Sequence, residues 1–273
     1  MSVRASCLNY DFSPIVGKIN ESCRYPTILV EGKNDSIIYS QILGEKSIII
    51  KNGKDNVIKE LTEHPRKNKI AIVDVDYDEK KDIDNLFYTD YNDLECMAIN
   101  LISKEDFCKY IRVDKLDEER FIKRIYEPVL NNVKELSNLW EFCYNNNLKF
   151  LVSEYDRRQN VLFNKIIDIK KNKINYSEIS NIYLSIGNYF IRNENISNIM
   201  RDNNNGNFRG HDFFSLLNFY VKRKDIKLNI DKLDNIDGKF IEEYFIEQSS
   251  KDQWIKKSKL YKDIKSKFND IFE

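Results

Sequence analysis

Glycine, proline and histidine are scarce in this 273-residue chain, with 8, 4 and 2 copies. Because all-β sandwiches need glycine and proline at their many turns, this scarcity argues against that class, and it also excludes collagen-like chains. No run approaches about 18 uninterrupted apolar residues, and residues 1–11 lack the basic segment and apolar run of a secretory signal. The sequence therefore predicts a helix-rich cytoplasmic protein that does not associate with membranes.

An excess of either charge is also missing, since 44 Lys and Arg residues match 44 Asp and Glu residues. Without a global positive field, any contact with nucleic acid must be local. A CxxC pair is absent as well, which argues against a zinc site or a disulfide framework. The five cysteines, which we expect to be buried free thiols, are Cys7, Cys23, Cys96, Cys108 and Cys143.

The first part of the chain alternates short apolar runs with helical patterns. Very apolar strands that are each followed by a helix are typical of a parallel sheet covered on both faces. A fourth strand leads into a further helix near Asn92. The predicted strands are 27–31, 47–51, 69–74 and 85–89, and the helices between the first three are 34–43 and 55–63.

After about residue 103 the pattern becomes mostly helical. Residues 148–153 are the only later strand candidate, and they could add an edge to the same sheet. We therefore predict an α/β domain over residues 1–112 and a helical region over residues 113–273. The expected helices are 115–130, 133–144, 176–191, 211–221, 238–247 and 251–272.

The first informative motif, VEGKND at residues 30–35, follows an apolar strand. Glu31 lies at the carboxyl end of this strand, and Asp35 lies in the first turn of the next helix. In parallel α/β sheets this edge is where ligands bind. The alternative is that Asn34 and Asp35 only cap the helix and that Glu31 is solvated.

The second motif, DVDYD at residues 74–78, also follows an apolar strand. Side chains two residues apart on an extended backbone point to the same side, so Asp74 and Asp76 are expected to converge on one hard cation. Nine acids and two bases lie between Asp74 and Glu95, and this much like charge is costly unless it is solvated or neutralised. A solvated loop is the preferred interpretation for the other nearby acids, Asp78, Glu79, Asp82 and Asp84.

The third motif, YTDYNDLE at residues 88–95, ends a strand and opens a helix. Asp93 and Glu95 fall at the start of that helix and could reach a metal ion. Acids at this position are also favoured by the helix dipole, so a purely structural role is the alternative. We expect one of the two to be a metal ligand.

The combination of VEGKND, a second strand, IVDVD and YTDYNDLE resembles the Toprim domain, the metal-binding nucleotidyl-transfer and nuclease domain of topoisomerases, primases and OLD-family nucleases. More narrowly, it resembles the bacterial Toprim-like family that acts as the nuclease subunit of PARIS anti-phage systems beside an ABC-type ATPase. The resemblance covers roughly residues 14–220, because RGHDFFSLL at residues 209–217 matches a late segment of that family. Its most specific part is Glu-Gly followed by Asp-x-Asp with one βα unit between them.

The resemblance implies a Toprim-like parallel sheet flanked by helices, followed by a mostly α-helical second half. Glu31 would be a general acid/base or a ligand of a second metal, and Asp74 with Asp76 would hold Mg²⁺ or Mn²⁺. Asp35 and Glu95 would be accessory ligands or would orient metal-bound water. No strand-passage domain is recognisable, so a topoisomerase is not expected. The remaining accessory residues are Lys33, Asp93 and His211.

His211 has two interpretations. It either opens an apolar helix with its imidazole satisfied locally, or it packs onto the acidic site or contacts a phosphate. Several basic stretches are expected to be solvated unless they face the acids, and the last of them could dock a partner or support self-association. These stretches are 157–158, 170–173, 222–224 and the lysine-rich terminus 251–273.

The leading hypothesis is a Mg²⁺-dependent Toprim nuclease that cleaves phosphodiester bonds in DNA or RNA, with tRNA as one candidate. It would be an anti-phage defence effector activated by an ABC-type ATPase partner, and a homo-oligomer is compatible with this role. The first alternative is a catalytically silent Toprim-like binding or regulatory subunit of an ATPase complex. The second is a primase-type nucleotidyl transferase, for which the sequence shows no nucleotide pocket.

Overall fold

The structure is a computed structural model that describes residues 27–43, 48–146, 163–179, 181, 207–224 and 238–268. The chain divides into two compact units. The first unit comprises Met1–Val73, Asp82–Phe87 and Asp263–Glu273, and the second comprises Asp74–Lys81 and Tyr88–Lys262. The predicted domain boundary after residue 112 remains a prediction.

A four-stranded sheet in the order β2-β1-β3-β4 forms the centre of the first unit. β1 pairs in parallel with both neighbours, and its Leu29 lies opposite Ile49 of β2 and Ala71 of β3. All residues of β3 are buried, as expected for a strand covered on both faces. The strands are β1 (Thr27–Val30), β2 (Ile48–Ile50), β3 (Lys69–Val73) and β4 (Leu86–Tyr88).

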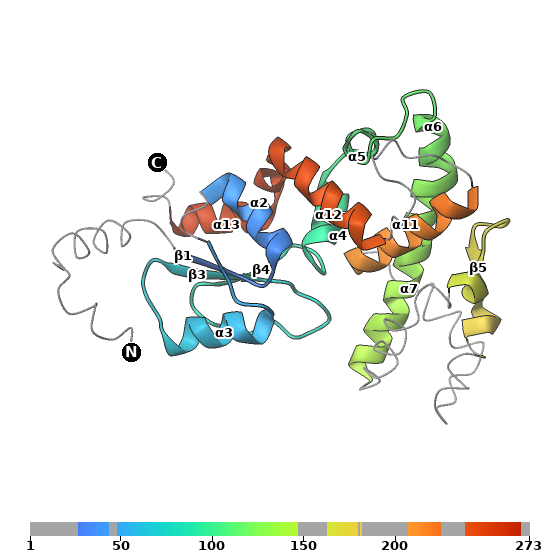
Figure 1. The fold of residues 1–273 in the computed structure, drawn as a ribbon. Helices are drawn as coiled ribbons and strands as arrows, with labels where there is room; N and C mark the ends of the chain where they lie inside the picture. Colours follow the sequence, from blue (N-terminus) through green and yellow to red (C-terminus); the bar gives the residue numbers. More distant parts are fainter. Residues whose placement is uncertain are drawn as a thin grey trace, which may run out of the picture. The chain divides into compact units, whose positions relative to one another are not determined.

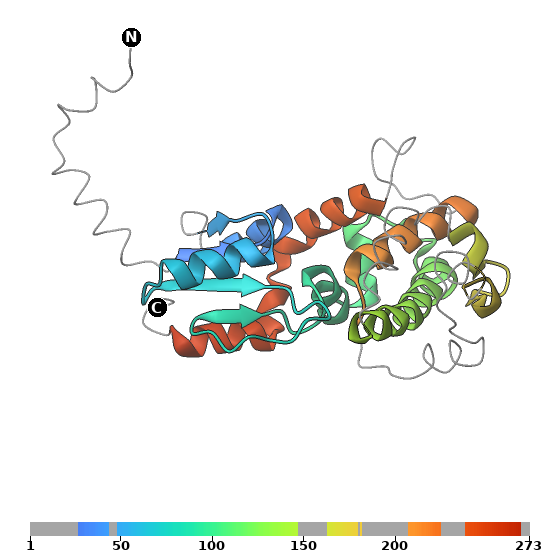
Figure 2. The ribbon, with the colours of Figure 1, turned by 90° about the horizontal axis from the view of Figure 1, so that it is seen from below.

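Two helices connect the first three strands, namely α2 (Lys33–Leu43) and α3 (Lys54–Glu63). They lie on opposite faces of the sheet, above and below the strands in Figure 1, and Figure 2 shows this unit from the side of α3. This placement follows from right-handed crossovers, because the connection from β1 to β2 and the connection from β2 to β3 run in opposite directions across the sheet. Two right-handed connections that run in opposite directions lie on opposite faces. The predicted α/β class and parallel sheet are confirmed.

The second unit is mostly helical, as predicted. Helices expected at 115–130 and 133–144 are instead one continuous helical run over 118–145. The wider π-helical turn of η2 lies inside this run, and the chain continues without a break. The segments are α6 (Glu118–Phe121), η2 (Ile122–Tyr126) and α7 (Glu127–Asn145).

Three further helices pack around an aromatic core in the second unit: α5 (Lys104–Tyr110), α11 (Gly210–Lys224) and α12 (Gly238–Ser249). The centre of this core is Phe107, which is fully buried. The helices expected at 211–221 and 238–247 are confirmed. The strand expected at 148–153 and most of the helix expected at 176–191 lie outside the described residues.

The helix expected over residues 251–272 is wrong as a single element. Gln253 has a left-handed backbone with φ of 49°, which a continuous helix cannot contain. The described part is therefore divided into η4 (Ser250–Asp252), η5 (Trp254–Lys257) and α13 (Lys259–Lys267). The apolar side chains of this segment are nonetheless buried, namely Trp254, Leu260, Ile264 and Phe268.

Three of the five cysteines fall in described regions, and each is a buried free thiol, as predicted. Burial raises the pKa of both Cys108 and Cys143 to about 12, so these thiols stay protonated. No helix in the described ranges is long and apolar enough to cross a membrane.

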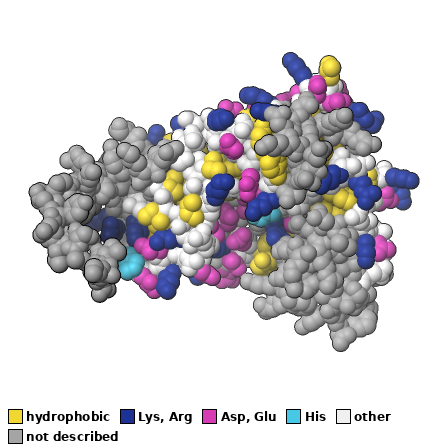
Figure 3. Space-filling model, viewed as in Figure 1, with side chains coloured by type: hydrophobic (Ala, Val, Ile, Leu, Met, Phe, Trp, Pro, Cys, Tyr) yellow, Lys and Arg dark blue, Asp and Glu magenta, His cyan; other side chains and the backbone are white. Residues whose placement is uncertain are grey.

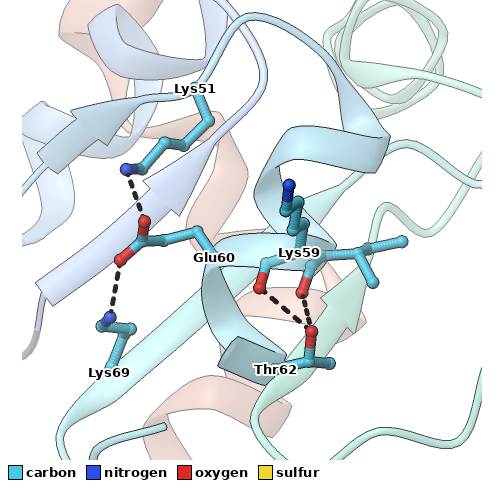
Figure 4. Close-up of polar contacts among 6 residues, drawn as sticks. Lys51, Lys59, Glu60, Thr62 and Lys69 are labelled. Carbon is cyan, nitrogen blue, oxygen red and sulfur yellow. Dashed lines mark hydrogen bonds and ion pairs between the residues drawn. The ribbon is translucent and has the colours of Figure 1, made fainter. Parts of the chain in front are cut away.

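Glu60 of α3 links two lysines that follow or begin strands of the sheet (Figure 4). Its two carboxylate oxygens lie 2.9 Å from Lys51 Nζ and 3.0 Å from Lys69 Nζ, and Lys69 is buried. Hydrogen bonds from these two ammonium groups lower the pKa of Glu60 from 4.5 to about 2. The carboxylate therefore stabilises the folded state fully above pH 4.5, and this contribution is lost as the pH falls from 4.5 towards 2.

We expect Glu60→Gln to lower the free energy of unfolding at pH 7, because Lys69 then keeps a buried charge without its carboxylate partner. The difference from wild type should shrink as the pH falls below 4.5, since protonation removes the same charge from the native protein. Urea denaturation at several pH values measures both effects. Glu63→Gln is the matched control on the same helix, because its exposed pair with Lys59 spans 3.9 Å. Equal pH dependence in the two variants would contradict the argument.

Candidate active site

The strand order places a topological switch point at the carboxyl ends of β1 and β3. The first connection runs from β1 to β2, which lies on one side of β1. The second connection runs back from β2 past β1 to β3, which lies on the other side of β1, so the direction of the connections reverses between β1 and β3. Open α/β sheets bind ligands at such switch points. Glu31 follows β1 directly and Asp74 follows β3 directly, so each of the two predicted motifs begins at this sheet edge.

At the end of β1, the VEGKND segment makes a tight turn into α2. The Glu31 carbonyl accepts a hydrogen bond from Gly53 N at 3.2 Å, which fixes the backbone of the predicted catalytic acid. Asp35 Oδ2 accepts from Gly32 N at 2.8 Å, so Asp35 has the capping role that was the alternative to metal binding. Lys33 is exposed on the first turn of α2.

At the end of β3, the chain leaves the extended conformation sooner than predicted. Asp76 has φ of 52°, so the alternation that was expected to aim Asp74 and Asp76 to the same side does not hold. Both residues instead join the segment before α4 (Leu94–Leu101). Asp74 Oδ1 accepts from Leu94 N at 3.1 Å, and Asp76 N donates to Asn92 O at 2.7 Å.

The start of α4 holds two buried acids. Asp93 is the N-cap of the helix, and its Oδ1 accepts from Cys96 N at 2.7 Å. Its other oxygen accepts from Gly210 N at 2.8 Å, across 117 residues of sequence. Glu95 is buried beside it. The pKa of Asp93 is raised to about 6, mainly by burial and to a smaller extent by the charge of Glu95.

Asn92 adds a further oxygen to this region. It is buried, and within the described part of the chain its Oδ1 has no hydrogen-bond partner. Its Nδ2 lies 3.4 Å from Asp93 Oδ2. An orphaned carbonyl oxygen among carboxylates is a donor set that hard cations such as Mg²⁺ prefer.

No group of three or more His, Cys, Asp or Glu side chains in the described ranges is arranged to hold a metal ion. Mg²⁺ does not require such a cage, because it keeps several waters and binds one or two carboxylates together with substrate phosphates. Asp74 accepts from the first turn of α4, Glu95 is buried in that turn, and Asn92 precedes it with an unpartnered amide oxygen among the described residues. The predicted ligand set of Glu31, Asp74, Asp76 and Glu95 remains a prediction.

The beginning of α11 packs directly against the acids of α4. A Cβ atom on Gly210 would lie 2.2 Å from Glu95 Cβ and 2.7 Å from Asp93 Oδ1, so only glycine fits. The next residue, His211, pairs through Nδ1 with Glu242 of α12 at 2.7 Å. Sequence reasoning identified His211 but missed Gly210 and Glu242, because their partners are distant in sequence. It also missed Asn92, whose amide lies beside the adjacent Asp93.

The second unit therefore brings together four of the predicted residues, at or next to the start of α4: Asp74, Asp93, Glu95 and His211. Asp76 is anchored to the same segment through its backbone. The next residue, Tyr77, contacts α7, and its hydroxyl lies 2.5 Å from Ser137 Oγ of that helix. The first unit holds the remaining predicted residues, which are Glu31, Lys33 and Asp35.

Comparison with known proteins adds no further assignment to these residues. No family model matches the chain, and no curated protein or solved structure is significantly similar to it.

Proposed function

We propose that this protein is a Toprim-like, Mg²⁺- or Mn²⁺-dependent nuclease that hydrolyses phosphodiester bonds in DNA or RNA. The observation that carries the proposal is the grouping of Asp74, Asp93 and Glu95 at the start of α4. Asp93 and Glu95 are buried next to each other, and a hydrated cation would offset the repulsion between their charges.

In the proposed reaction, a water molecule forms a new bond to phosphorus while the bond to one bridging oxygen breaks. The departing oxygen takes up a proton, so the products are a phosphomonoester and an alcohol. A bound cation would polarise the phosphate and lower the pKa of the attacking water. Asp74 and Glu95 would hold the cation with the amide oxygen of Asn92. The motif resemblance implies that Glu31 of the first unit is a general acid/base or a ligand of a second metal.

The proposed biological role is that of an anti-phage effector controlled by an ABC-type ATPase. The motif resemblance supports it, and so does the charge of the chain, which has no net excess of either sign. Acidic and basic side chains are interspersed on the face shown in Figure 3. A protein without a dominant basic field has weak general affinity for nucleic acid, so a partner that delivers or activates it is a consistent means of control.

One observation favours the alternative, a catalytically silent regulatory subunit. The carboxylates of Asp74 and Asp93 both accept hydrogen bonds from the first turn of α4. Acids that cap a helix stabilise it without any metal. The two functions are separated by variants that preserve the caps and remove the charge.

We expect purified wild-type protein to cleave plasmid DNA or total tRNA with Mg²⁺ or Mn²⁺, alone or with the ABC-type ATPase. Asp74→Asn should lose cleavage by at least about 100-fold, because the amide keeps the oxygen that caps α4 but not the charge that binds a cation. Glu31→Gln should lose cleavage as well, which tests the acid assigned from the first unit. Asp78→Asn is the control, because Asp78 is an exposed acid of the same segment.

Two outcomes would support the regulatory alternative. The first is the absence of cleavage with every polymer, cation and partner. The second is cleavage that Asp74→Asn and Glu31→Gln leave unchanged. A rise in melting temperature with Mg²⁺ that disappears in Asp74→Asn would establish cation binding separately from activity.

A further inference from the structure

We propose that four lysines of the second unit form a surface that binds the phosphate backbone of nucleic acid. They are Lys256, Lys257, Lys259 and Lys262, here called the lysine patch. The choice of nucleic acid as the polyanion rests on the proposed nuclease function, and the inference adds a place where the polymer is held. Three observations carry it: the local charge, the exposure of the lysines and the anchoring of the backbone beneath them.

The lysine patch concentrates charge of one sign in a chain that has no net charge. Residues 253–262 contain four lysines and no Asp or Glu, whereas the whole chain has equal numbers of basic and acidic residues. A local excess of this kind creates a positive potential that attracts polyanions, even where the net charge of the protein is zero. Any contact of this chain with nucleic acid must be local, and this stretch meets that condition.

The lysines of the patch are available to a ligand. All four are exposed, and Lys256, Lys257 and Lys262 form no ion pair with any residue that the structure describes. By contrast, Lys123 pairs with Glu119 at 2.6 Å, which is the arrangement expected of a solvated surface charge. An unpaired ammonium group can contact a phosphate without first losing a partner in the protein.

The backbone under the patch is held in place by buried side chains and a capping carboxylate. Trp254, Ile255 and Leu260 are each 2% exposed, and η5 packs against α4, the helix that begins with the candidate acids. The Asp90 carboxylate accepts hydrogen bonds from Lys259 N at 2.6 Å and from Leu260 N at 2.7 Å, so it caps the start of α13. The patch therefore belongs to a fixed segment, and binding has to order only its side chains.

The surroundings of the patch favour nucleic acid over a membrane surface. A helix that lies on a bilayer inserts its apolar face into the lipid, but here Trp254 and Leu260 are buried in the protein. Lysine is a flexible point charge that suits phosphate oxygens, whereas planar groups such as that of arginine read base edges. Residues 254–262 contain no arginine. We therefore expect contacts with the backbone and little preference for sequence.

Binding in the absence of divalent cations tests the inference separately from cleavage. The full chain is titrated, in EDTA, into fluorescein-labelled DNA and RNA oligonucleotides of two unrelated sequences, and fluorescence anisotropy reports binding. We expect the triple variant Lys256→Gln, Lys257→Gln and Lys262→Gln to bind at least about tenfold more weakly to both sequences. The plot of log affinity against log salt should also become shallower by about 2–3, because each phosphate contact contributes about 0.7–0.9 to its slope.

The matched control removes the same charge from paired lysines of the same unit. Lys123, Lys171 and Lys239 are exposed and lie 2.6 Å, 3.7 Å and 3.9 Å from a carboxylate. Their replacement with glutamine should weaken binding by about twofold or less. Equal losses in the two triple variants would mean that net charge governs binding, and the inference would be overturned. The single variants Lys256→Gln and Lys262→Gln supply the same comparison if a triple variant does not fold.

Three further results would overturn the inference. The first is absence of oligonucleotide binding by wild type. The second is sedimentation of wild type with phosphatidylserine vesicles that the triple variant of the patch loses, which would indicate a membrane surface. The third is displacement of the oligonucleotide by polyglutamate at equal charge concentration, which would indicate an acidic protein. Wild type that binds through the patch but does not cleave with Mg²⁺ or Mn²⁺ would contradict only the proposed nuclease function.

Discussion

Replacing Gly210 with alanine should be among the most damaging single changes to this protein, with a cost of about 3 kcal/mol or more in the free energy of unfolding. The added methyl group would lie 2.2 Å from Glu95 Cβ and 2.9 Å from the backbone nitrogen of Cys96. Neither atom is the end of a flexible side chain, so relief requires that α11 moves away from α4. This movement would also lengthen the hydrogen bond from Gly210 N to Asp93.

Gly32→Ala is the matched control, because it adds the same methyl group to the other glycine next to a predicted acid. The nearest atom to that methyl group would be Asp35 Oδ2 at 3.5 Å, an ordinary contact. Urea denaturation of both variants, with circular dichroism as the signal, provides the comparison. If Gly210→Ala unfolds at the same urea concentration as Gly32→Ala, the close approach of α11 to α4 is not a feature of the protein in solution.

The sheet could be predicted from sequence because its determinants are local. The apolar, β-branched runs at 27–31 and 69–74 end in polar residues, and glycine or asparagine follows the strand at 47–51. Each of these strands is present within about two residues of its predicted limits. The helices of the second half were predicted for the same reason, since an apolar stripe at helical spacing needs no knowledge of its partner.

The errors arose where tertiary contacts override local pattern. Asp76 continues an apolar strand in sequence, yet its amide bonds to Asn92 O and its backbone turns into the left-handed region. Gln253 also adopts the left-handed backbone and breaks a segment with a continuous helical pattern, there with only a local hydrogen bond to Ser250 O. Asparagine, aspartate and glutamine at positive φ carry no sequence signature as distinct as that of glycine.

In the candidate site, too, local features could be predicted from sequence and long-range contacts could not. Its acids could be found because they follow strands or open helices, which are positions that sequence defines. The contacts that organise them could not be found, because Gly210 reaches Asp93 across 117 residues and Glu242 reaches His211 from another helix. The sequence offered one signal for these contacts, namely that a glycine, a rare residue in this chain, directly precedes one of its two histidines.

A large loss of stability is also expected when the aromatic core of the second unit is disrupted, because Phe107 makes ring contacts with four other aromatic residues. Its ring centroid lies 4.9 Å from those of Tyr126 and Phe245, 5.7 Å from that of Phe213 and 6.3 Å from that of Phe214. The contact with Phe213 is edge-to-face at 90°, a geometry that adds to the effect of burial. Phe107 thus joins α5 to the two helices that carry His211 and Glu242.

We expect Phe107→Ala to cost about 3–5 kcal/mol in the free energy of unfolding, since it removes a fully buried ring from a core of rigid side chains. Phe240→Ala is the control with identical chemistry, because Phe240 is 40% exposed and its removal should cost about 0.5 kcal/mol or less. Urea denaturation measures both. A cost below about 1.5 kcal/mol for Phe107→Ala would show that the core collapses around the cavity, and then α11 and α12 would not depend on this ring for their position. A cost in the expected range, together with weakened pairing of His211 and Glu242 by NMR, would show that the aromatic core positions these two residues.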